Sequence, residues 1–202
     1  ALAVGDFVTV AGLVQNDDDD SDSDSDSDSD GSGSDDAPFE IDSVVVMQGE
    51  KGSFQPHKGR VNEGFNAGTG EFTIDLDADQ GIETDGALLA LFQDGTRVFD
   101  KHGKPLAPEA IAPGVHGYFE GRLVLSDADP DVLKTALIVL EMAPSGDDDV
   151  LRGEIATLNG VGLVLMTGEG DRCVVFEDDT EVFLIRPDDG NGIRSERGML
   201  DD

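Results

Sequence analysis

One segment of the chain, Asp17–Asp36, carries a dense set of side chains that could bind cations. It holds 11 acidic residues and no Lys or Arg, and aspartate alternates with serine through most of it. Within it, Asp26, Asp28 and Asp30 stand at alternate positions and are followed by Gly31. Oxygen ligands at this spacing, before a glycine that allows a sharp turn, resemble the opening of a calcium-binding loop.

This acidic segment has two interpretations. In a complete calcium loop the twelfth position supplies a bidentate glutamate, whereas this chain has Ala37 there, so an EF-hand is not expected. Low-complexity acidic segments are usually solvated and disordered. If the segment is instead ordered, it requires bound counterions, because holding so many like charges in one conformation without them is costly. Binding of Ca²⁺ or another divalent cation therefore stays open, and the candidate ligands are Asp26, Asp28, Asp30, Asp35 and Asp36.

Two shorter clusters share the same alternation of carboxylates. On a strand, alternate side chains lie on one face, so these carboxylates repel each other unless a cation or a basic side chain lies between them. Aspartates that cap loops and turns are the favoured explanation, with metal binding as the alternative. The candidate ligands are Asp75, Asp77 and Asp79 in one cluster and Asp127, Asp129 and Asp131 in the other.

Other chemistry finds little support in the sequence. The three histidines, His57, His102 and His116, lack the spacing of a zinc site, and His116 is expected at a surface or an edge. The single cysteine, Cys173, lies in an apolar stretch and is expected to be a small core residue. The chain has no nucleophile elbow, phosphate loop or dinucleotide fingerprint. We therefore expect a protein that is not an enzyme, with no catalytic and no cofactor-binding residues.

Composition narrows the setting and the partners. The 202 residues include 13 Lys and Arg against 45 Asp and Glu, for a net charge of −32, of which −21 lies outside Asp17–Asp36. Such a charge disfavours nucleic acid and anionic membrane surfaces as partners, and no apolar run is long enough to span a membrane. It suits a salty or divalent-rich, extracellular, periplasmic or cell-surface environment, with an acidic cytosolic protein as the alternative. The first residue is Ala rather than Met, which predicts a processed or partial chain.

Short apolar stretches broken by Gly, Asp and Pro predict an all-β protein. Turns are expected at 66–68, 94–95, 159–160 and 168–170, and the clearest hairpin is at Asn159-Gly160. Helical periodicity is confined to short turns at Pro108–Ile111 and Asp131–Lys134. The predicted strands are Asp6–Leu13, Ile41–Met47, Gly59–Glu63, Gly70–Leu76, Ala87–Phe92, Arg97–Phe99, Val115–Leu125, Ala136–Met142, Arg152–Leu158, Gly162–Thr167, Arg172–Phe176 and Glu181–Ile185.

Two sequence elements occur twice. The first, which we call the head, begins with Gly59–Val61 in one copy and with Gly153–Ile155 in the other, 94 positions later. Its last strand contains Thr96–Phe99 in one copy and Thr180–Phe183 in the other, 84 positions later. Because the element is repeated, both heads are expected to form the same set of strands.

The second element, which we call the tail, joins a Gly-rich strand, a loop and an apolar strand. Gly5–Gly12 resembles Gly114–Gly121, which lies 109 positions later. The apolar strands that follow are Asp42–Gln48 and Thr135–Glu141. The chain thus reads as a tail at 1–48, a complete head and tail at 58–142, and a second head at 152–202, with the acidic insertion 17–36 inside the first tail.

The tail strand and the Thr-x-Val-Phe strand before it resemble a family of bacterial repeat domains of unknown function. That resemblance implies small OB-like β-barrels in exported proteins and lipoproteins, and it supplies no catalytic residues. The chain departs from the family pattern in its Asp/Ser insertion and in lacking one head and one tail. The positions that match are Gly5, Val8, Val10 and Gly12 in the first tail and Gly114, Tyr118 and Gly121 in the second.

An incomplete barrel exposes unpaired strand edges, which favours the addition of further strands. We therefore expect two small OB-like antiparallel β-barrels, one of them completed by N-terminal strands added to the C-terminal half. The added strands come from the same chain, from a second copy in a head-to-tail homo-oligomer, or from a longer tandem array. The expected function is an extracytoplasmic structural or interaction protein, such as a filament or surface-layer subunit. A monomeric module that binds Ca²⁺, a glycan or a surface is the alternative.

Overall fold

Strands make up most of the described chain, because its short apolar stretches alternate in burial and are separated by turn residues. The computed structural model describes residues 2–14, 39–47, 54–78, 87–125, 131–140, 150–188 and 192–198. In these residues one short 3-10 helix, η1 (Pro108–Ala110), accompanies the strands. The strands are β1 (Phe7–Val14), β2 (Phe39–Met47), β3 (Gln55–Asn66), β4 (Glu71–Leu76), β5 (Leu88–Asp100), β6 (His116–Val124), β7 (Val132–Leu140), β8 (Val150–Asn159), β9 (Gly162–Thr167), β10 (Gly170–Pro187) and β11 (Ile193–Arg197).

Five consecutive strands form a closed barrel, which we call the continuous barrel. Its strands are hydrogen-bonded in the order β3-β4-β5-β7-β6, and β6 returns to pair with β3. All pairs are antiparallel except β5 with β7, which is parallel. Five strands closed in this order form an OB-like barrel.

The other strands form a second ring, which we call the split barrel. The sheet order is β11-β10-β2-β1-β8-β9, and β9 also pairs with β10, so β10, β2, β1, β8 and β9 close on themselves. Here too one pair is parallel, β2 with β10. The short strand β11 adds to the far end of β10. The all-β prediction with two small barrels is confirmed, with one parallel pair in each barrel.

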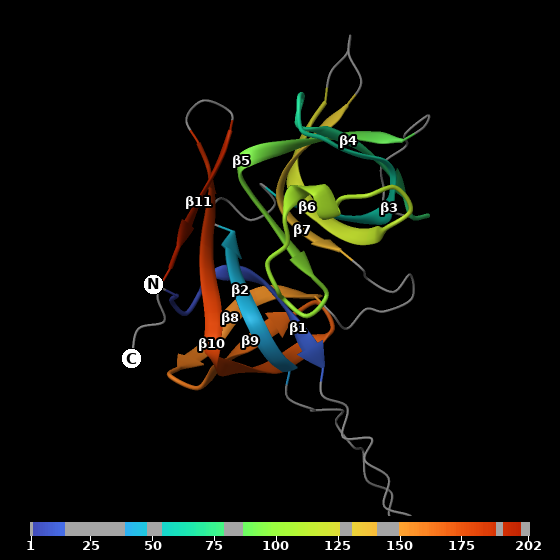
Figure 1. The fold of residues 1–202 in the computed structure, drawn as a ribbon. Coiled ribbons are helices and arrows are strands. Elements are labelled where there is room, and N and C mark those ends of the chain that lie inside the picture. Colours follow the sequence, from blue (N-terminus) through green and yellow to red (C-terminus); the bar gives the residue numbers. More distant parts are fainter. Residues whose placement is uncertain are drawn as a thin grey trace, which may run out of the picture.

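The split barrel is completed by the N-terminal strands of the same chain. Strand β1 lies between β2 and β8, with Phe7 opposite Glu154 and Ala11 opposite Val150. Figure 1 shows the blue β1 and the light-blue β2 among the orange and red strands β8–β10. Of the three sources considered for the added strands, the structure shows the intrachain one.

The two barrels share one strand pairing scheme. Tyr118 on β6 lies opposite Lys58 on β3, and its counterpart Thr9 on β1 lies opposite Arg152 on β8. Tyr118 and Thr9 are 109 positions apart, which is the offset found between the two tail strands. Lys58 and Arg152 are 94 positions apart, which is the offset found between the first strands of the two heads. For the second tail strand the offset is also 94, because β2 and β7 pair in equivalent registers with β1 and β6.

The entry into the first tail strand is also repeated. Gly5 and Gly114 have φ angles of 92° and 87°, which favour glycine. The Gly5 N–H donates to the carbonyl oxygen of Ile155, and the Gly114 N–H donates to that of Val61, at 2.9 and 2.8 Å. Because Val61 and Ile155 are themselves counterparts, the same turn opens the tail in both barrels.

Each barrel has its own apolar core. Val8, Val10 and Leu165 are fully buried inside the split barrel. Phe72 and Phe119 pack inside the continuous barrel with ring centroids 6.0 Å apart. A fully buried side chain of this size stabilises the fold by about 1.5–3 kcal/mol, so each barrel has a separate source of stability.

Several predicted elements differ from the structure. The stretches Ala87–Phe92 and Arg97–Phe99 are one strand, β5, whose pairing with β7 shifts between Phe92 and Arg97. The predicted turn at 94–95 is therefore a bulge within β5. In the same way, the two predicted strands between 172 and 185 are one strand, β10, and most of the predicted helical turn at Asp131–Lys134 belongs to β7.

Most of the turns predicted from local sequence agree with the structure. The turns at 66–68, 159–160 and 168–170 connect β3 to β4, β8 to β9 and β9 to β10. The helical turn expected at Pro108–Ile111 is present as η1. Strand β11 was not predicted, because Ile193 is the only apolar residue in it. No helix in the described ranges is both long and apolar enough to cross a membrane.

Candidate functional site

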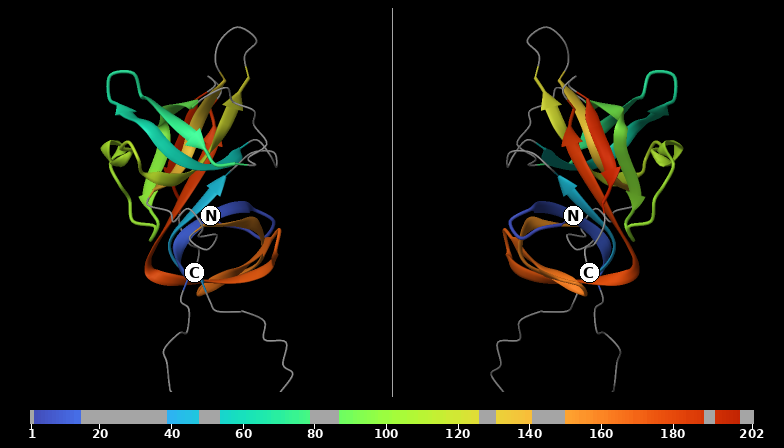
Figure 2. Two further views of the ribbon diagram at one scale, coloured as in Figure 1. Left: turned by 90° about the vertical axis from the view of Figure 1, so that its right-hand side faces the viewer. Right: turned by 90° about the vertical axis from the view of Figure 1, so that its left-hand side faces the viewer.

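The two barrels meet through a buried apolar cluster, with β10 and β11 of the split barrel against β5 of the continuous barrel (Figure 2). Phe99 on β5 and Phe183 on β10 pack with ring centroids 5.3 Å apart. Val45 and Val139 belong to the same cluster, and both are fully buried. This cluster joins the barrels into one packed unit.

The interface uses equivalent residues from both barrels. Phe99 and Phe183 are counterparts at the offset of 84, and each lies opposite a valine, Val139 or Val45, at the same place in its ladder. Two pairs of equivalent residues, Phe99 with Phe183 and Val139 with Val45, therefore belong to this interface.

A buried carboxylate lies at this interface. Glu120 on β6 is fully buried, and its Oε2 accepts hydrogen bonds from Thr9 Oγ1 at 2.8 Å and Tyr118 Oη at 2.7 Å. Its Oε1 accepts from Arg152 Nε at 3.0 Å. Arg152 also donates to the carbonyl oxygen of Phe54 at 2.8 Å and lies over the ring of Phe7. The network thus links both barrels.

This network is suited to structure rather than to acid–base chemistry. Burial raises the pKa of Tyr118 well above its usual 10.0, and the charge of Glu120 and the hydrogen bond to it raise this pKa further, while Arg152 opposes the shift. Tyr118 therefore stays protonated and donates its hydroxyl proton to Glu120. Both carboxylate oxygens of Glu120 are already occupied, so this group holds the barrels in register.

His57 is a second buried polar side chain, and it has no such network. It lies on β3, is 3% exposed, and neither ring nitrogen has a hydrogen-bond partner among the described residues. Burial lowers its pKa below 6.5, because the charged ring is poorly solvated. Its counterpart in the split barrel is Leu151, which packs against the apolar core there.

Replacing His57 by Leu is expected to raise the free energy of unfolding by about 1 kcal/mol, because two unpaired buried nitrogens are removed. The gain should grow as the pH falls below about 6.5, since only the unfolded wild-type chain then takes up a proton at this histidine. Urea unfolding of both proteins between pH 7.5 and 5.5 measures the gain.

The matched control for this experiment is His116→Leu. His116 is also buried, yet its Nε2 lies 2.8 Å from Asp77 Oδ2, so removing this ring should destabilise the protein. A His57→Leu protein that is less stable than wild type at every pH would show that the ring of His57 is needed where it lies.

The predicted metal ligands that can be placed do not converge. Asp75 is exposed on β4, Asp77 follows the end of β4, and Asp131 directly precedes β7. Among the described residues, no group of three or more His, Cys, Asp or Glu side chains is placed to hold a metal ion. The other predicted ligands lie outside the described residues; they are Asp26, Asp28, Asp30, Asp35, Asp36, Asp79, Asp127 and Asp129.

Asp75 and Asp77, the two members of their cluster that the structure describes, each lie near a basic side chain. Asp75 lies opposite Arg60 of β3 in the ladder, and Asp77 binds His116 of β6. Each of these two carboxylates therefore has a basic side chain as its neighbour, and neither needs a bound cation to offset its charge. The prediction of a surface or edge position for His116 is wrong, because the ring is only 7% exposed.

The remaining reactive side chains are isolated. Cys173 is exposed on β10, so the prediction of a core residue is wrong: its neighbour Val174 points into the barrel instead. The Nδ1 of His102 is buried without a partner among the described residues. Neither side chain belongs to the Glu120 network.

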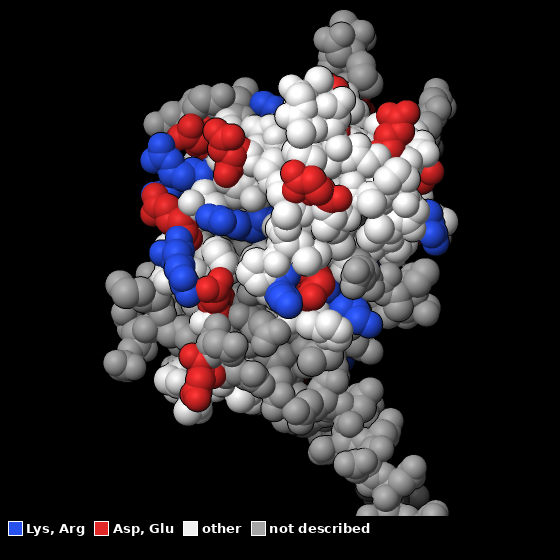
Figure 3. All heavy atoms as spheres, in the orientation of Figure 1, with Lys and Arg blue, Asp and Glu red and all other residues white. Residues whose placement is uncertain are grey.

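Acidic and basic side chains lie close together over β10 and β11, where Figure 3 shows them intermingled in red and blue. They form the ion pairs Arg186–Glu196, Arg194–Asp188 and Arg197–Glu181. Because each of these three arginines has an acidic partner, the pairs together carry no net charge. Exposed pairs of this kind stabilise a fold by at most about 1 kcal/mol.

No protein-family model, curated protein or solved structure matches this chain. Membership in the exported repeat-domain family therefore stays a prediction.

Proposed function

We propose that this chain is a non-enzymatic, extracytoplasmic structural and interaction protein. In this proposal the two packed barrels are the structural part of the protein, and the acidic insertion Asp17–Asp36 binds divalent cations. The observation that carries it is the pairing of Val14 with Phe39, since the insertion connects two strands that are neighbours in the split barrel.

Electrostatics support a role for cations. Eleven carboxylates between two paired strand ends repel each other, and a bound divalent cation relieves that repulsion. Carboxylate oxygens are the ligands that Ca²⁺ prefers, and extracellular modules bind it with dissociation constants of about 10⁻⁴–10⁻³ M. The net charge of −21 on the rest of the chain adds to the attraction.

A second candidate is self-association by exchange of the β1–β2 hairpin. This hairpin pairs with β8 and β10, and these contacts are the same whether the hairpin comes from its own chain or from a second copy. Exchange of an identical element is a low-cost route to oligomers. The intrachain closure shows that a single chain is able to complete both barrels.

Calcium titration by calorimetry tests the first candidate. The full chain is expected to bind Ca²⁺ with a dissociation constant of about 10⁻⁴–10⁻³ M. A variant with Asn at all 11 aspartates of Asp17–Asp36 should lose this binding, whereas Asp75→Asn on the exposed face of β4 should retain it. If the Asn variant binds Ca²⁺ as tightly as the wild-type chain, the insertion is not the Ca²⁺ site.

Light scattering on the same samples addresses the second candidate. A monomeric mass with Ca²⁺ and with a chelator, across a wide range of protein concentrations, would argue against hairpin exchange. A mass that rises with concentration would support it.

A further inference from the structure

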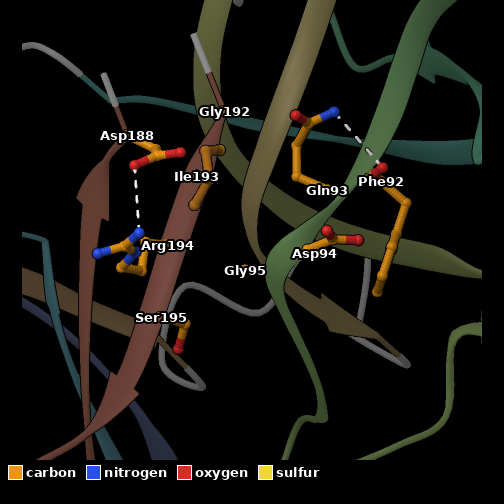
Figure 4. A pocket seen from close by; sticks show the side chains of 9 residues that line it. All are labelled: Phe92, Gln93, Asp94, Gly95, Asp188, Gly192, Ile193, Arg194 and Ser195. Atoms are coloured by element: carbon orange, nitrogen blue, oxygen red, sulfur yellow. Dashed lines mark hydrogen bonds and ion pairs between the residues drawn. The ribbon is translucent and has the colours of Figure 1, made fainter. Parts of the chain in front are cut away.

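A groove lies between β5 of the continuous barrel and the β10–β11 end of the split barrel (Figure 4). Its volume is about 440 Å³. Gln93 and Asp94 lie on its β5 side, and Asp188, Arg194 and Ser195 lie on the opposite side. These side chains make the groove polar, in contrast to the apolar cluster between the barrels.

The β5 side of the groove is a braced bulge. Pairing with β7 is interrupted between Phe92 and Arg97, which pushes the residues between them outward. The hydroxyl of Thr96 donates to the carbonyl oxygen of Thr135 at 2.6 Å and accepts from the N–H of Gln93 at 2.8 Å. The bulge is therefore held in place, and its side chains are directed toward the groove before any ligand arrives.

Two glycines shape the floor of the groove. A Cβ on Gly95 would lie 2.2 Å from the carbonyl oxygen of Ile193, so the backbones of β5 and β11 touch there. At Gly192 a Cβ would lie 4.0 Å from both Asp188 Oδ2 and Gln93 Oε1. Two hydrogen-bond acceptors from opposite sides therefore converge over Gly192.

Donors and acceptors are balanced in this region. Arg194 lies 3.6 Å from Asp188, and Arg97 donates from Nε to Ser195 Oγ at 2.8 Å, which leaves the serine proton free to be donated. Asp94 adds a second carboxylate. Two carboxylates and two guanidinium groups give a site without net charge, in a chain whose net charge is −32.

A second, more apolar pocket adjoins the groove at two shared residues. It has a volume of about 240 Å³ and shares Phe92 and Asp94 with the polar groove. Pro105, Leu106 and Phe183 contribute apolar surface to it. One ligand can therefore place polar groups on one side of Asp94 and apolar groups on the other.

We propose that this composite groove binds a short neutral oligosaccharide. Sugar hydroxyls donate and accept equally, which matches the balanced set of Asp94, Gln93, Ser195 and Arg194. The C–H faces of a sugar ring suit the apolar cavity beside Phe92. Concave sites with apolar surface and a few convergent polar groups are typical of small-ligand binding.

Charged ligands fit the groove less well. An anion is repelled by the net charge of the chain, and a cation meets both Arg97 and Arg194. The proposal does not rest on cation binding, because the acidic insertion joins β1 to β2 whereas the groove is formed by β5, β10 and β11. The two proposals can therefore fail separately.

NMR titration of the ¹⁵N-labelled full chain tests the inference, with cellotriose, chitotriose and maltotriose as probes up to about 10 mM, a range that detects weak binding. At least one trisaccharide should shift the amides of Gly95, Thr96, Gly192 and Ser195. Asp94→Asn and Gln93→Ala should each weaken that binding by about fivefold or more, because the first replaces a charged acceptor with a neutral amide and the second removes the amide altogether. Asp75→Asn, on β4, is the matched control and should leave binding unchanged.

Three results would overturn the proposal. The first is the absence of shifts with all three trisaccharides. The second is binding that is equally strong in Asp94→Asn and Gln93→Ala. The third is a stronger response at these amides to a lysine-containing tripeptide than to any trisaccharide, which would assign the groove to a cationic peptide instead.

Discussion

Replacing Arg152 by Leu is expected to lower the free energy of unfolding by about 3–5 kcal/mol. Arg152 is the cation that lies against the fully buried Glu120, and its side chain is itself only 26% exposed. Without it, Glu120 keeps only the hydroxyl donors Thr9 and Tyr118. Urea unfolding, with the transition midpoint and slope compared between proteins, measures the loss.

The double variant Glu120→Leu with Arg152→Leu separates the cost of an unpaired charge from the value of the pair. Replacing both members of a buried pair by apolar residues is often nearly neutral, so the double variant should recover much of the loss. Arg186→Leu is the control, since Arg186 forms an exposed ion pair with Glu196 and should cost at most about 1 kcal/mol. If Arg152→Leu costs no more than Arg186→Leu, the buried network does not hold the barrels together.

The repeats explain why much of the fold could be predicted from the sequence. The tail strands Gly5–Gly12 and Gly114–Gly121 share their spacing because both open with the same glycine turn and take the same place in a barrel. The unmatched first tail and second head left three sources of completing strands open, and closure within the same chain was one of them. Only coordinates distinguish the intrachain pairing of β1 with β8 from pairing with a second copy, because the local sequence is the same in either case.

Elements set by tertiary contacts were harder to predict. The Asp94-Gly95 pair has the sequence of a turn, yet Gly95 lies in a bulge because the backbone of Ile193 packs directly against it. Strand β11 has almost no apolar pattern, and it exists because it pairs with the end of β10. Both features belong to the groove, so sequence reasoning did not find that site.

The buried network was missed for a similar reason. Glu120 is a single acidic residue in an apolar strand, and its partners Thr9 and Arg152 lie 111 and 32 positions away. One signal was available: Tyr118 and Glu120 share a strand face that also carries His116, so this face holds polar groups that require partners. His116 on this face has such a partner, because its Nε2 lies within hydrogen-bonding distance of Asp77 Oδ2.

Val8→Asp is expected to unfold the split barrel and leave the continuous barrel folded. Val8 is fully buried in the split-barrel core, and a carboxylate there, without a cation beside it, costs about 4 kcal/mol or more. Such a cost is comparable to the total stability of a small domain. The continuous barrel closes with its own strands and has its own core, so it does not require the β1–β2 hairpin to stay paired.

Amide hydrogen exchange resolves the two barrels in one experiment. In Val8→Asp the amides of β8, β9 and β10 should lose protection together with those of β1 and β2, while β3–β7 stay protected. Val4→Asp is the control, because Val4 is 64% exposed and its replacement should change nothing. If β8–β10 keep their protection in Val8→Asp, then the C-terminal strands fold without the N-terminal hairpin, and the intrachain completion of the split barrel is contradicted.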